Sequence, residues 1–314
     1  MSREKLLITG GAGFVGSNLI RYLSGNNKFE ISVLDNESLG KEANIGPYEY
    51  NFIKADIRDE RAVREALTGV KYLIHLAADT RVMDSIQDPA KNFEVNVLAT
   101  FRLLEQAREL GISRIIFAST GGAILGDVAP PINEEMVARP LAPYGASKLA
   151  IEGYLSAYSA SYNLPSIVLR FSNIYGVNSY HKGSVVAHFF KQILLGDDLI
   201  VFGDGTQKRD FLYVDDLMKG IEDALYADAN GVYQLGSGKP TSVNELIDAM
   251  RAVIGDEFKI NVLYKDFRPG EVKETWCDIS RARMALGFNP DTKLIDGLSR
   301  TWNWFKQNYS VSIS

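Results

Sequence analysis

The chain has 314 residues, of which 46% are hydrophobic and 23% charged, so it is long enough for two domains with ordinary globular cores. Its net charge of −5 and its lack of a signal-like or membrane-spanning apolar run argue against nucleic acid or a membrane as partner and predict a cytoplasmic protein. The single cysteine, Cys277, excludes a disulfide within the chain, and no metal is expected because Cys277 and the three histidines lack the spacing of metal ligands.

A glycine-rich turn follows the first predicted strand, 5–8, and runs into a predicted helix over 17–23. Its glycines stand three residues apart, at Gly10, Gly13 and Gly16. In a strand–turn–helix unit, such glycines permit a tight turn, the approach of a pyrophosphate and close packing of the helix on the strand. The free N–H groups of the first helical turn then face the phosphates.

Asp35 ends the second predicted strand, 31–34. A carboxylate at that place can accept hydrogen bonds from both hydroxyls of an adenosine ribose, and it would repel a 2′-phosphate. The glycine turn and this acid together predict a dinucleotide site that prefers NAD to NADP.

Strand-like and helix-like runs go on alternating through the first half of the chain. The predicted strands are 51–53, 72–76, 114–118 and 166–171, and the predicted helices are 61–67, 92–110 and 144–162. The helix over 92–110 places Phe93, Val97, Phe101 and Leu104 on one stripe. The alternation predicts an α/β fold, a Rossmann-type doubly wound parallel sheet with helices on both faces.

The second half is more irregular, with glycine-marked turns between predicted helices over 185–195, 214–226 and 242–254. This pattern predicts a smaller mixed α/β C-terminal domain that closes over the carboxyl ends of the parallel strands, where ligands bind in open α/β sheets. The expected domains are 1–176 for NAD, to which 211–236 return, and 177–314 for the substrate.

Tyr144 and Lys148 stand four residues apart, so that they share one face of a helix. A cation beside a phenol favours the phenolate, and we expect Lys148 to lower the pKa of Tyr144 from about 10. Such a tyrosine can take the proton of an alcohol while hydride leaves the same carbon. Ser119 and Thr120 close the preceding strand, and either hydroxyl could bond to the same substrate oxygen.

These motifs resemble the extended short-chain dehydrogenase/reductase family, and within it the UDP-glucose (UDP-galactose) 4-epimerases. The resemblance covers essentially the whole chain and rests on TGGAGFVGSNL (9–19), Asp35, Asp56-Ile57, HLAA (75–78), Asn96, ASTGGAILG (118–126), YGASK (144–148), RFSNIYG (170–176), GDGTQKRDFLYVDD (203–216) and RPGE (268–271). It implies NAD as cofactor, a UDP-sugar as substrate, and a homodimer built on the helix over 92–110 and the helix that begins near Tyr144.

The resemblance also implies a role for each matched residue. Cofactor contacts fall on Gly10, Gly13, Phe14, Val15, Gly16, Asp35, Asp56, Ile57, Leu76, Ala77, Ala78, Asn96, Tyr144 and Lys148. The catalytic residues are Thr120, Tyr144 and Lys148, with Ser119 as the alternative to Thr120. Substrate contacts fall on Ser119, Asn173, Arg209, Arg268, Glu271 and Thr275.

The residues at two positions limit which reaction and which sugar substrates the resemblance implies. Thr120 is followed by Gly121 and Gly122, where relatives that dehydrate sugars carry an acid pair. This difference implies 4-epimerisation of UDP-glucose and UDP-galactose by transient oxidation at C4, with NAD retained. Thr275 stands where a large tyrosine in related epimerases excludes N-acetylated sugars, so UDP-N-acetylhexosamines are expected as further substrates. The alternatives are a UDP-glucuronate epimerase or decarboxylase, a dehydratase, a reductase, and a catalytically silent NAD-binding regulator.

Overall fold

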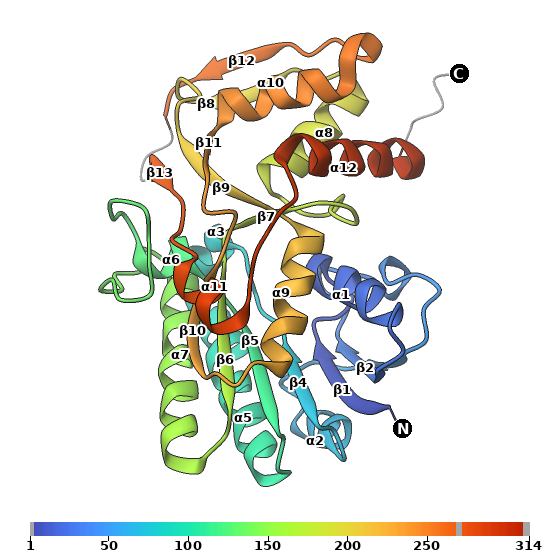
Figure 1. The fold of residues 1–314 in the computed structure, drawn as a ribbon, viewed down its shortest axis with the longest axis vertical. Helices are drawn as coiled ribbons and strands as arrows, with labels where there is room; N and C mark the ends of the chain where they lie inside the picture. The colour runs from blue at the N-terminus through green and yellow to red at the C-terminus, as the bar shows by residue number, and fades with distance from the viewer. Residues whose placement is uncertain (1–2, 268–271, 310–314) are drawn as a thin grey trace.

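The structure is a computed structural model that describes residues 3–267 and 272–309. It confirms the α/β fold, since seven parallel strands form one sheet in the order β10-β6-β5-β4-β1-β2-β3 (Figure 1). These strands are β1 (Glu4–Thr9), β2 (Phe29–Asp35), β3 (Asn51–Lys54), β4 (Tyr72–His75), β5 (Arg114–Thr120), β6 (Ser166–Phe171) and β10 (Gly231–Leu235). After β3 the chain returns to the other side of β1 as β4. The strand order therefore reverses between β1 and β4, which is where open α/β sheets form a ligand crevice.

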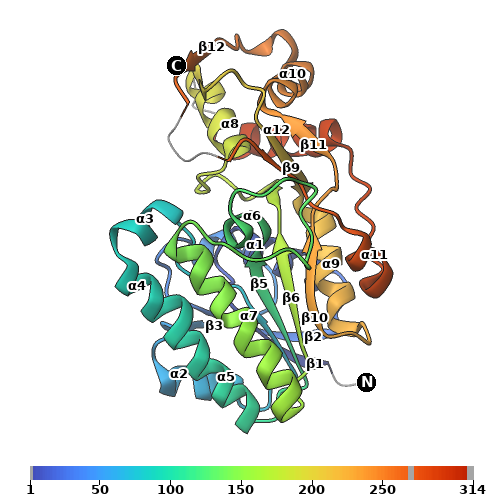
Figure 2. The same cartoon turned by 90° about the vertical axis from the view of Figure 1, so that its left-hand side faces the viewer.

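Helices cover both faces of this sheet (Figure 2). One face packs against α1 (Phe14–Ser24) and α9 (Val214–Tyr226), and the other against α2 (Glu60–Leu67), α5 (Ala99–Glu109) and α7 (Pro143–Tyr162). Adjacent residues of β1 enter different cores, because Leu6 packs with the first group of helices and Leu7 with the second. Burial on both faces is the physical reason why these strands are continuous apolar runs in the sequence.

The helix predicted over 92–110 is present but not uniform. It comprises α4 (Pro89–Phe93), one π-helical turn at Glu94–Leu98 and then α5. A π turn rotates the residues before it relative to those after it. Val97 and Leu104 are buried, whereas Phe93 is 56% exposed, so the predicted stripe is wrong at its first position.

A smaller mixed α/β lobe stands over the carboxyl ends of the large sheet (Figure 1). In it, β7 (Asn173–Tyr175), β11 (Pro240–Ser242) and β13 (Glu274–Thr275) pair with β9 (Lys208–Tyr213), and β8 (Leu199–Phe202) pairs with β12 (Val262–Lys265). Its helices are α8 (Val185–Leu195), α10 (Val243–Ile254) and α12 (Leu294–Tyr309). The predicted helices over 185–195 and 214–226 are confirmed as α8 and α9.

The helix predicted over 242–254 begins one residue later, because Ser242 is its cap. The Ser242 Oγ accepts from the Glu245 N–H at 3.1 Å, and the Glu245 carboxylate accepts from the Ser242 N–H at 2.7 Å. This reciprocal pair satisfies two N–H groups that the helix itself leaves open.

Short helices complete the two lobes. They are α3 (Val82–Gln87), α6 (Gly121–Leu125) and α11 (Ser280–Leu286), with 3₁₀ turns at Glu42–Asn44 and Gly255–Glu257. The segment α9–β10 lies with the large sheet, and α11 packs against both of its elements. The C-terminal part of the chain thereby contacts both lobes.

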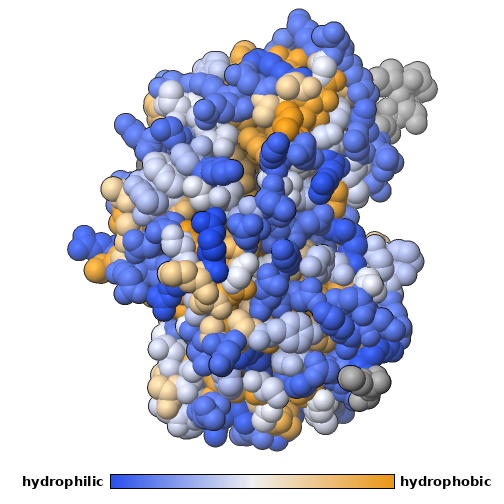
Figure 3. All heavy atoms as spheres, viewed as in Figure 1, coloured by the Kyte–Doolittle hydropathy of each residue, from blue (hydrophilic) through white to orange (hydrophobic). Residues whose placement is uncertain are grey.

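The face of the molecule seen in Figure 1 is covered mostly by hydrophilic side chains, with smaller apolar areas between them (Figure 3). Within residues 3–267 and 272–309, no helix is long and apolar enough to cross a membrane. Over the same ranges, no group of His, Cys, Asp or Glu side chains could hold a metal ion.

Candidate active site

The glycine turn between β1 and α1 leaves space that the protein does not fill. Gly10 has φ +72°, and a Cβ there would lie 2.6 Å from the backbone nitrogen of Ala77. A Cβ on Gly16 would lie 2.4 Å from the Cα of Gly11, so the packing of the protein itself requires both glycines. Gly13 is different, because the nearest atom to its Cβ would be the Gly10 oxygen at 3.3 Å. The absent side chain at Gly13 thus leaves room for a ligand.

The N-terminus of α1 supplies partial positive charge beside the space at Gly13. The helix starts at Phe14 with no side-chain cap and no acidic residue in its first turn, which also contains Val15 and Gly16. N–H groups and the helix dipole at such an end favour an anion. Together with the space at Gly13, this end fits the pyrophosphate of a dinucleotide.

Asp35 is held at the end of β2 by two backbone N–H groups. Its Oδ2 accepts from Ala12 at 3.0 Å and its Oδ1 from Glu37 at 2.7 Å. Burial raises the pKa of Asp35, and these two hydrogen bonds oppose the rise. Asp56 follows β3, and hydrogen bonds from the Arg58 side chain hold its pKa at about 2. Two carboxylates therefore stand at the ends of adjacent strands, where the adenosine half of the cofactor is expected.

The remaining predicted cofactor residues lie at or near the same edge of the large sheet, where the parallel strands end. Ile57, Leu76, Ala77 and Ala78 follow the ends of β3 and β4. Asn96, in the π turn, accepts from the Asp79 N–H at 2.7 Å and donates to the Asp79 oxygen at 2.9 Å and to Ser147 Oγ at 3.1 Å. The Asn96 side chain therefore ties the loop after β4 to α7.

Tyr144 and Lys148 lie one turn apart in α7. Lys148 is buried, and its Nζ donates to the Ala118 oxygen on β5 at 2.9 Å and lies 4.6 Å from the centre of the Phe117 ring. Burial lowers the pKa of Lys148 to about 7 and raises the pKa of Tyr144 to about 12. The predicted lowering of the Tyr144 pKa by Lys148 is therefore wrong for the chain by itself. Desolvation of the phenol is the larger effect, and Lys148 bonds to β5 instead.

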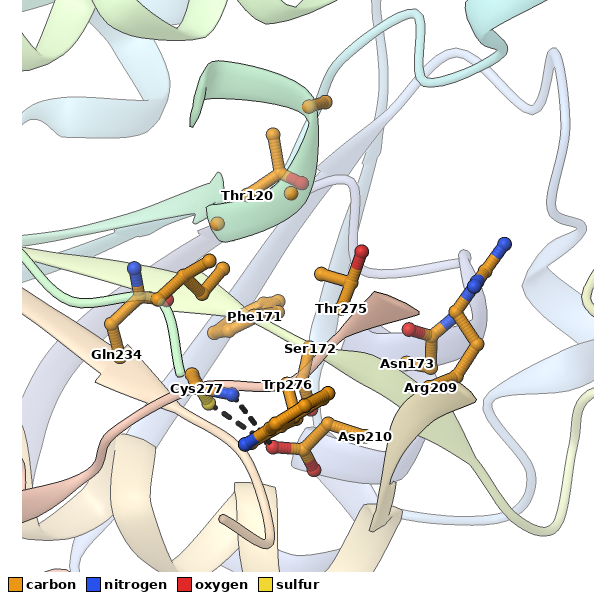
Figure 4. Close-up of a pocket in the computed structure, with 14 residues that line it drawn as sticks. Thr120, Phe171, Ser172, Asn173, Arg209, Asp210, Gln234, Thr275, Trp276 and Cys277 are labelled. Carbon is orange, nitrogen blue, oxygen red and sulfur yellow. Dashed lines mark hydrogen bonds between the residues drawn. The ribbon is translucent and has the colours of Figure 1, made fainter. Parts of the chain in front are cut away.

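Ser119 and Thr120 end β5, but their side chains have different surroundings. The Ser119 hydroxyl is buried and donates to Glu152 Oε1 at 2.6 Å. Thr120 is the residue before α6, its side chain makes no capping bond, and it lines a pocket (Figure 4). Of the two hydroxyls, that of Thr120 is the one at the pocket.

The pocket has a volume of about 240 Å³ and lies between the end of β5 and the smaller lobe. Its lining includes Thr120, Gly121, Gly122, Ala123, Ile132, Phe171, Ser172, Asn173, Arg209, Asp210, Gln234, Thr275, Trp276 and Cys277. Figure 4 shows Thr120 on the α6 turn, with Asn173, Arg209 and Thr275 on strands across from it. A Cβ on Gly122 would lie 3.3 Å from the Thr275 Cγ2, so Thr275 faces the turn that carries Thr120.

The structure brings together part of the predicted substrate set. Thr275 lies beside Arg209, because these two residues are paired in the register of β13 and β9. The Arg209 Nη1 donates to the Lys273 oxygen at 3.1 Å. Arg268 and Glu271 lie outside the described residues.

Asp210 is a pocket residue that the sequence reasoning missed. It is buried on β9 and accepts from the Ser237 N–H at 2.6 Å and the Gly238 N–H at 3.1 Å. It also accepts from the Cys277 Sγ at 3.2 Å (Figure 4). The carboxylate thereby joins β9 to the turn after β10 and to the segment that carries Thr275. The available signal in the sequence was the position of this acid directly before the apolar run Phe211–Val214.

Comparison with known proteins gives the family. A model of the NAD-dependent epimerase/dehydratase family matches residues 6–236. A putative UDP-glucose 4-epimerase of Methanocaldococcus jannaschii is 39% identical over 96% of this chain and 99% of that protein. The UDP-glucuronate 4-epimerase of Thermodesulfobacterium geofontis is 32% identical over 97% of each chain. The solved UDP-N-acetylglucosamine 4-epimerase of Methanobrevibacter ruminantium, in complex with UDP-N-acetylmuramic acid, has a TM-score of 0.91 and 30% identity, with 98% of this chain and 99% of that chain covered.

These relatives match this chain over nearly the whole of both lengths, and each is described as an epimerase. They differ in the sugar that their descriptions name. The chain belongs to the NAD-dependent epimerase/dehydratase family, and it is an epimerase with NAD as its cofactor.

Proposed function

We propose that the chain is a UDP-hexose 4-epimerase that interconverts UDP-glucose and UDP-galactose. The observation that carries this proposal is the pocket beside Thr120, with Gly121 and Gly122 where an elimination enzyme needs a second acid. Tyr144 and Lys148 lie on α7, which packs against the same strand. In this proposal, residues 1–176 and 211–236 form the NAD-binding domain, and residues 177–314 form the substrate domain.

Each catalytic side chain has one task in the proposed reaction. The Tyr144 Oη takes the proton of the sugar 4-hydroxyl in the first half of the reaction and returns it in the second. The Thr120 hydroxyl bonds to the same oxygen, and Lys148 and Asp35 hold the two riboses of the cofactor. Bound NAD⁺ would supply reversible hydride transfer at C4 of the sugar and a positive charge beside the phenol.

Inversion at C4 requires the 4-keto sugar to turn over between the two hydride transfers. In the proposal, Arg209 and Asn173 hold the diphosphate, as the planar donor fork of arginine suits. The sugar then lies among small residues, since Gly121, Gly122 and Ala123 line the pocket next to Thr120. Tight binding of the nucleotide and loose binding of the sugar permit the turn.

A panel of UDP-sugars tests the proposed function. The purified chain, without added cofactor, is incubated with UDP-glucose, UDP-galactose, UDP-N-acetylglucosamine and UDP-glucuronate, and the products are separated. The expected result is the C4 epimer of UDP-glucose, with no net change in NADH absorbance. Loss of water or of carbon dioxide would assign the chain to another reaction of the family, net use of free NADH would make it a reductase, and no turnover of any sugar would favour an NAD-binding regulator.

Thr275 is expected to decide which hexoses are accepted. Because its methyl group faces Gly122 across the pocket, a tyrosine ring at this position would fill the space that an N-acetyl group needs. We expect the wild type to epimerise UDP-N-acetylglucosamine as well as UDP-glucose. Thr275→Tyr should lower kcat/KM for the acetylated sugar by about 100-fold relative to UDP-glucose.

The matched control is Thr275→Ser, which removes one methyl group and should keep both activities. An equal loss of both activities in Thr275→Tyr would contradict this assignment, as would a wild type that ignores the acetylated sugar.

We also propose that two copies of the chain pair through α4, α5 and α7. Phe93 on α4 is 56% exposed, and Tyr154 and Tyr162 on α7 are 42% and 54% exposed. The Tyr154 ring lies 5.3 Å from that of Phe101 on α5, so the aromatic residues span neighbouring helices. Exposed aromatic side chains are enriched at protein interfaces.

Light scattering at micromolar concentration should give the mass of two chains. Tyr154→Asp should give the mass of one, because a charge in the centre of an apolar interface opposes association. Leu195→Asp, which changes an exposed leucine of the smaller lobe, is the control and should remain a dimer. A wild type with the mass of one chain would refute the pairing.

A further inference from the structure

A buried ion pair lies behind the turn that carries Thr120, and the proposed reaction makes no use of it. Glu152 on α7 and Arg170 on β6 are 5% and 6% exposed. The Arg170 Nη2 lies 2.7 Å from Glu152 Oε2, and the Arg170 Nε lies 3.0 Å from Glu152 Oε1. The pair is therefore bidentate, which fixes the orientation of the carboxylate.

Glu152 is linked to the proposed catalytic residues in two ways. Its Oε1 accepts from the Ser119 Oγ at 2.6 Å, and Ser119 directly precedes Thr120 on β5. Lys148 lies four residues before Glu152 on α7, so the two side chains share one face of the helix. One carboxylate thus holds the end of β5 and lies on the same helix face as the buried Lys148.

We propose that Glu152, on the basis of the proposed epimerase function, is a positioning residue for the reaction. It fixes the Ser119–Thr120 strand end, and it keeps Lys148 in its ammonium form. Glu152 touches neither substrate nor cofactor and acts through these neighbours.

The charged and titratable groups around Lys148 come from three elements. Tyr144 and Glu152 lie on α7, His75 lies on β4, and Arg170 lies on β6 behind Glu152. In the chain without cofactor, Tyr144 is neutral because burial raises its pKa to about 12, and His75 is neutral because burial and the Lys148 charge lower its pKa to about 3. Burial lowers the pKa of Lys148, and the Glu152 charge raises it. Within this group, Glu152 is the anion that compensates Lys148.

Stability alone gives a weak reason for a charged pair at this place. The Arg170 Nη1 is buried and has no hydrogen-bond partner among the described residues. Replacing a buried ion pair by neutral groups of similar volume often leaves stability unchanged or raises it. A structural role and a positioning role can therefore be separated by variants that remove the charge.

The first test is Glu152→Gln, which keeps the shape of the side chain and an acceptor for Ser119 but removes the charge. Lysine labelled with ¹³C at Cε reports the titration of Lys148 by NMR, with Lys148→Met to assign the signal. We expect the midpoint to fall by about one pH unit, since a nearby opposite charge raises the pKa of an ammonium group.

The same variant should shift the pH profile of kcat. A lower ammonium pKa means that Lys148 loses its proton at lower pH, so the alkaline limb moves to lower pH by the same amount. At pH values above that limb, kcat of the variant should be about tenfold lower than kcat of the wild type, because a shift of one pH unit changes the charged fraction of Lys148 by a factor of ten. KM for UDP-glucose should change by no more than about twofold, since Glu152 does not touch the substrate. An unchanged midpoint in folded Glu152→Gln would overturn the proposal.

Glu152→Gln leaves Arg170 unpaired and can therefore impair folding. The double variant Glu152→Gln/Arg170→Gln removes both charges, and its two amides can bond to each other. Of the two partners, Glu152 is the one that shifts the Lys148 pKa, so the double variant should regain the wild-type Tm yet keep the shifted titration.

A double variant that regains both the Tm and the wild-type titration would show a structural pair and overturn the proposal. A wild type without epimerase activity would refute the proposed function instead. The NMR titration would still decide whether Glu152 keeps Lys148 protonated.

Discussion

Tyr144→Phe should lower kcat by about 10²- to 10⁴-fold, the usual contribution of a general acid–base group. The variant loses the hydroxyl that carries the proton of the sugar in both halves of the proposed reaction. The ring remains, and so does the hydrogen bond from the Tyr144 N–H to Ser85 Oγ at 3.2 Å. Bound NAD should stay at the wild-type level, measured by absorbance after acid extraction.

The control for this experiment is Tyr154→Phe, which removes a hydroxyl from a residue of the same helix that does not line the pocket. Its kcat should equal that of the wild type. Wild-type turnover in Tyr144→Phe would mean that another group carries the proton. That result would also contradict the proposed roles of Thr120 and Lys148.

Gly13→Val should remove bound NAD without unfolding the chain. The wild type is expected to keep NAD through purification, because the proposed reaction returns the cofactor to its starting state. Gly13 has φ −74°, which valine adopts, and its Cβ would meet only the Gly10 oxygen, at 3.3 Å. The added methyl groups would instead lie where the pyrophosphate approaches the start of α1. We expect an NAD content below about a tenth of the wild-type value, since every phosphate contact of this turn depends on close approach.

Gly16→Ala is the contrasting control for Gly13→Val. Its Cβ would lie 2.4 Å from the Gly11 Cα and 2.5 Å from the Gly10 oxygen, so this smaller change should prevent the packing of α1 on β1. Circular dichroism distinguishes the two outcomes, with cooperative unfolding for Gly13→Val and loss of structure for Gly16→Ala. A folded Gly13→Val that retains full NAD would place the cofactor phosphates elsewhere.

The sequence predicted best those features that depend on residues close together in the chain. Spacing by three at Gly10, Gly13 and Gly16 belongs to one turn, whose backbone geometry is local. The pairing of Tyr144 with Lys148 follows from the pitch of one helix. The ends of β2 and β5, which carry Asp35 and Thr120, could be located because the apolar runs of buried parallel strands stop there.

Phe93 shows where local periodicity fails. The stripe that includes Phe93, Val97 and Leu104 assumes a uniform helix, and the π turn at Glu94–Leu98 breaks that assumption. The Asn96 side chain in this turn reaches Asp79 and Ser147, which lie 17 and 51 residues away in the sequence. Contacts of that kind depend on how the elements pack, and residue spacing does not encode them.

By itself, then, the sequence determined the parallel α/β sheet, the glycine turn between β1 and α1 and the positions of Thr120, Tyr144 and Lys148, because backbone geometry and hydrophobic periodicity act over a few residues. Tertiary structure alone decided which hydroxyl, that of Ser119 or Thr120, faces the pocket, since Glu152 on another element takes the first. It also decided the ionisation of Tyr144 and Lys148. Burial raises the pKa of Tyr144 and lowers that of Lys148, and desolvation is the sum of every element packed around a group.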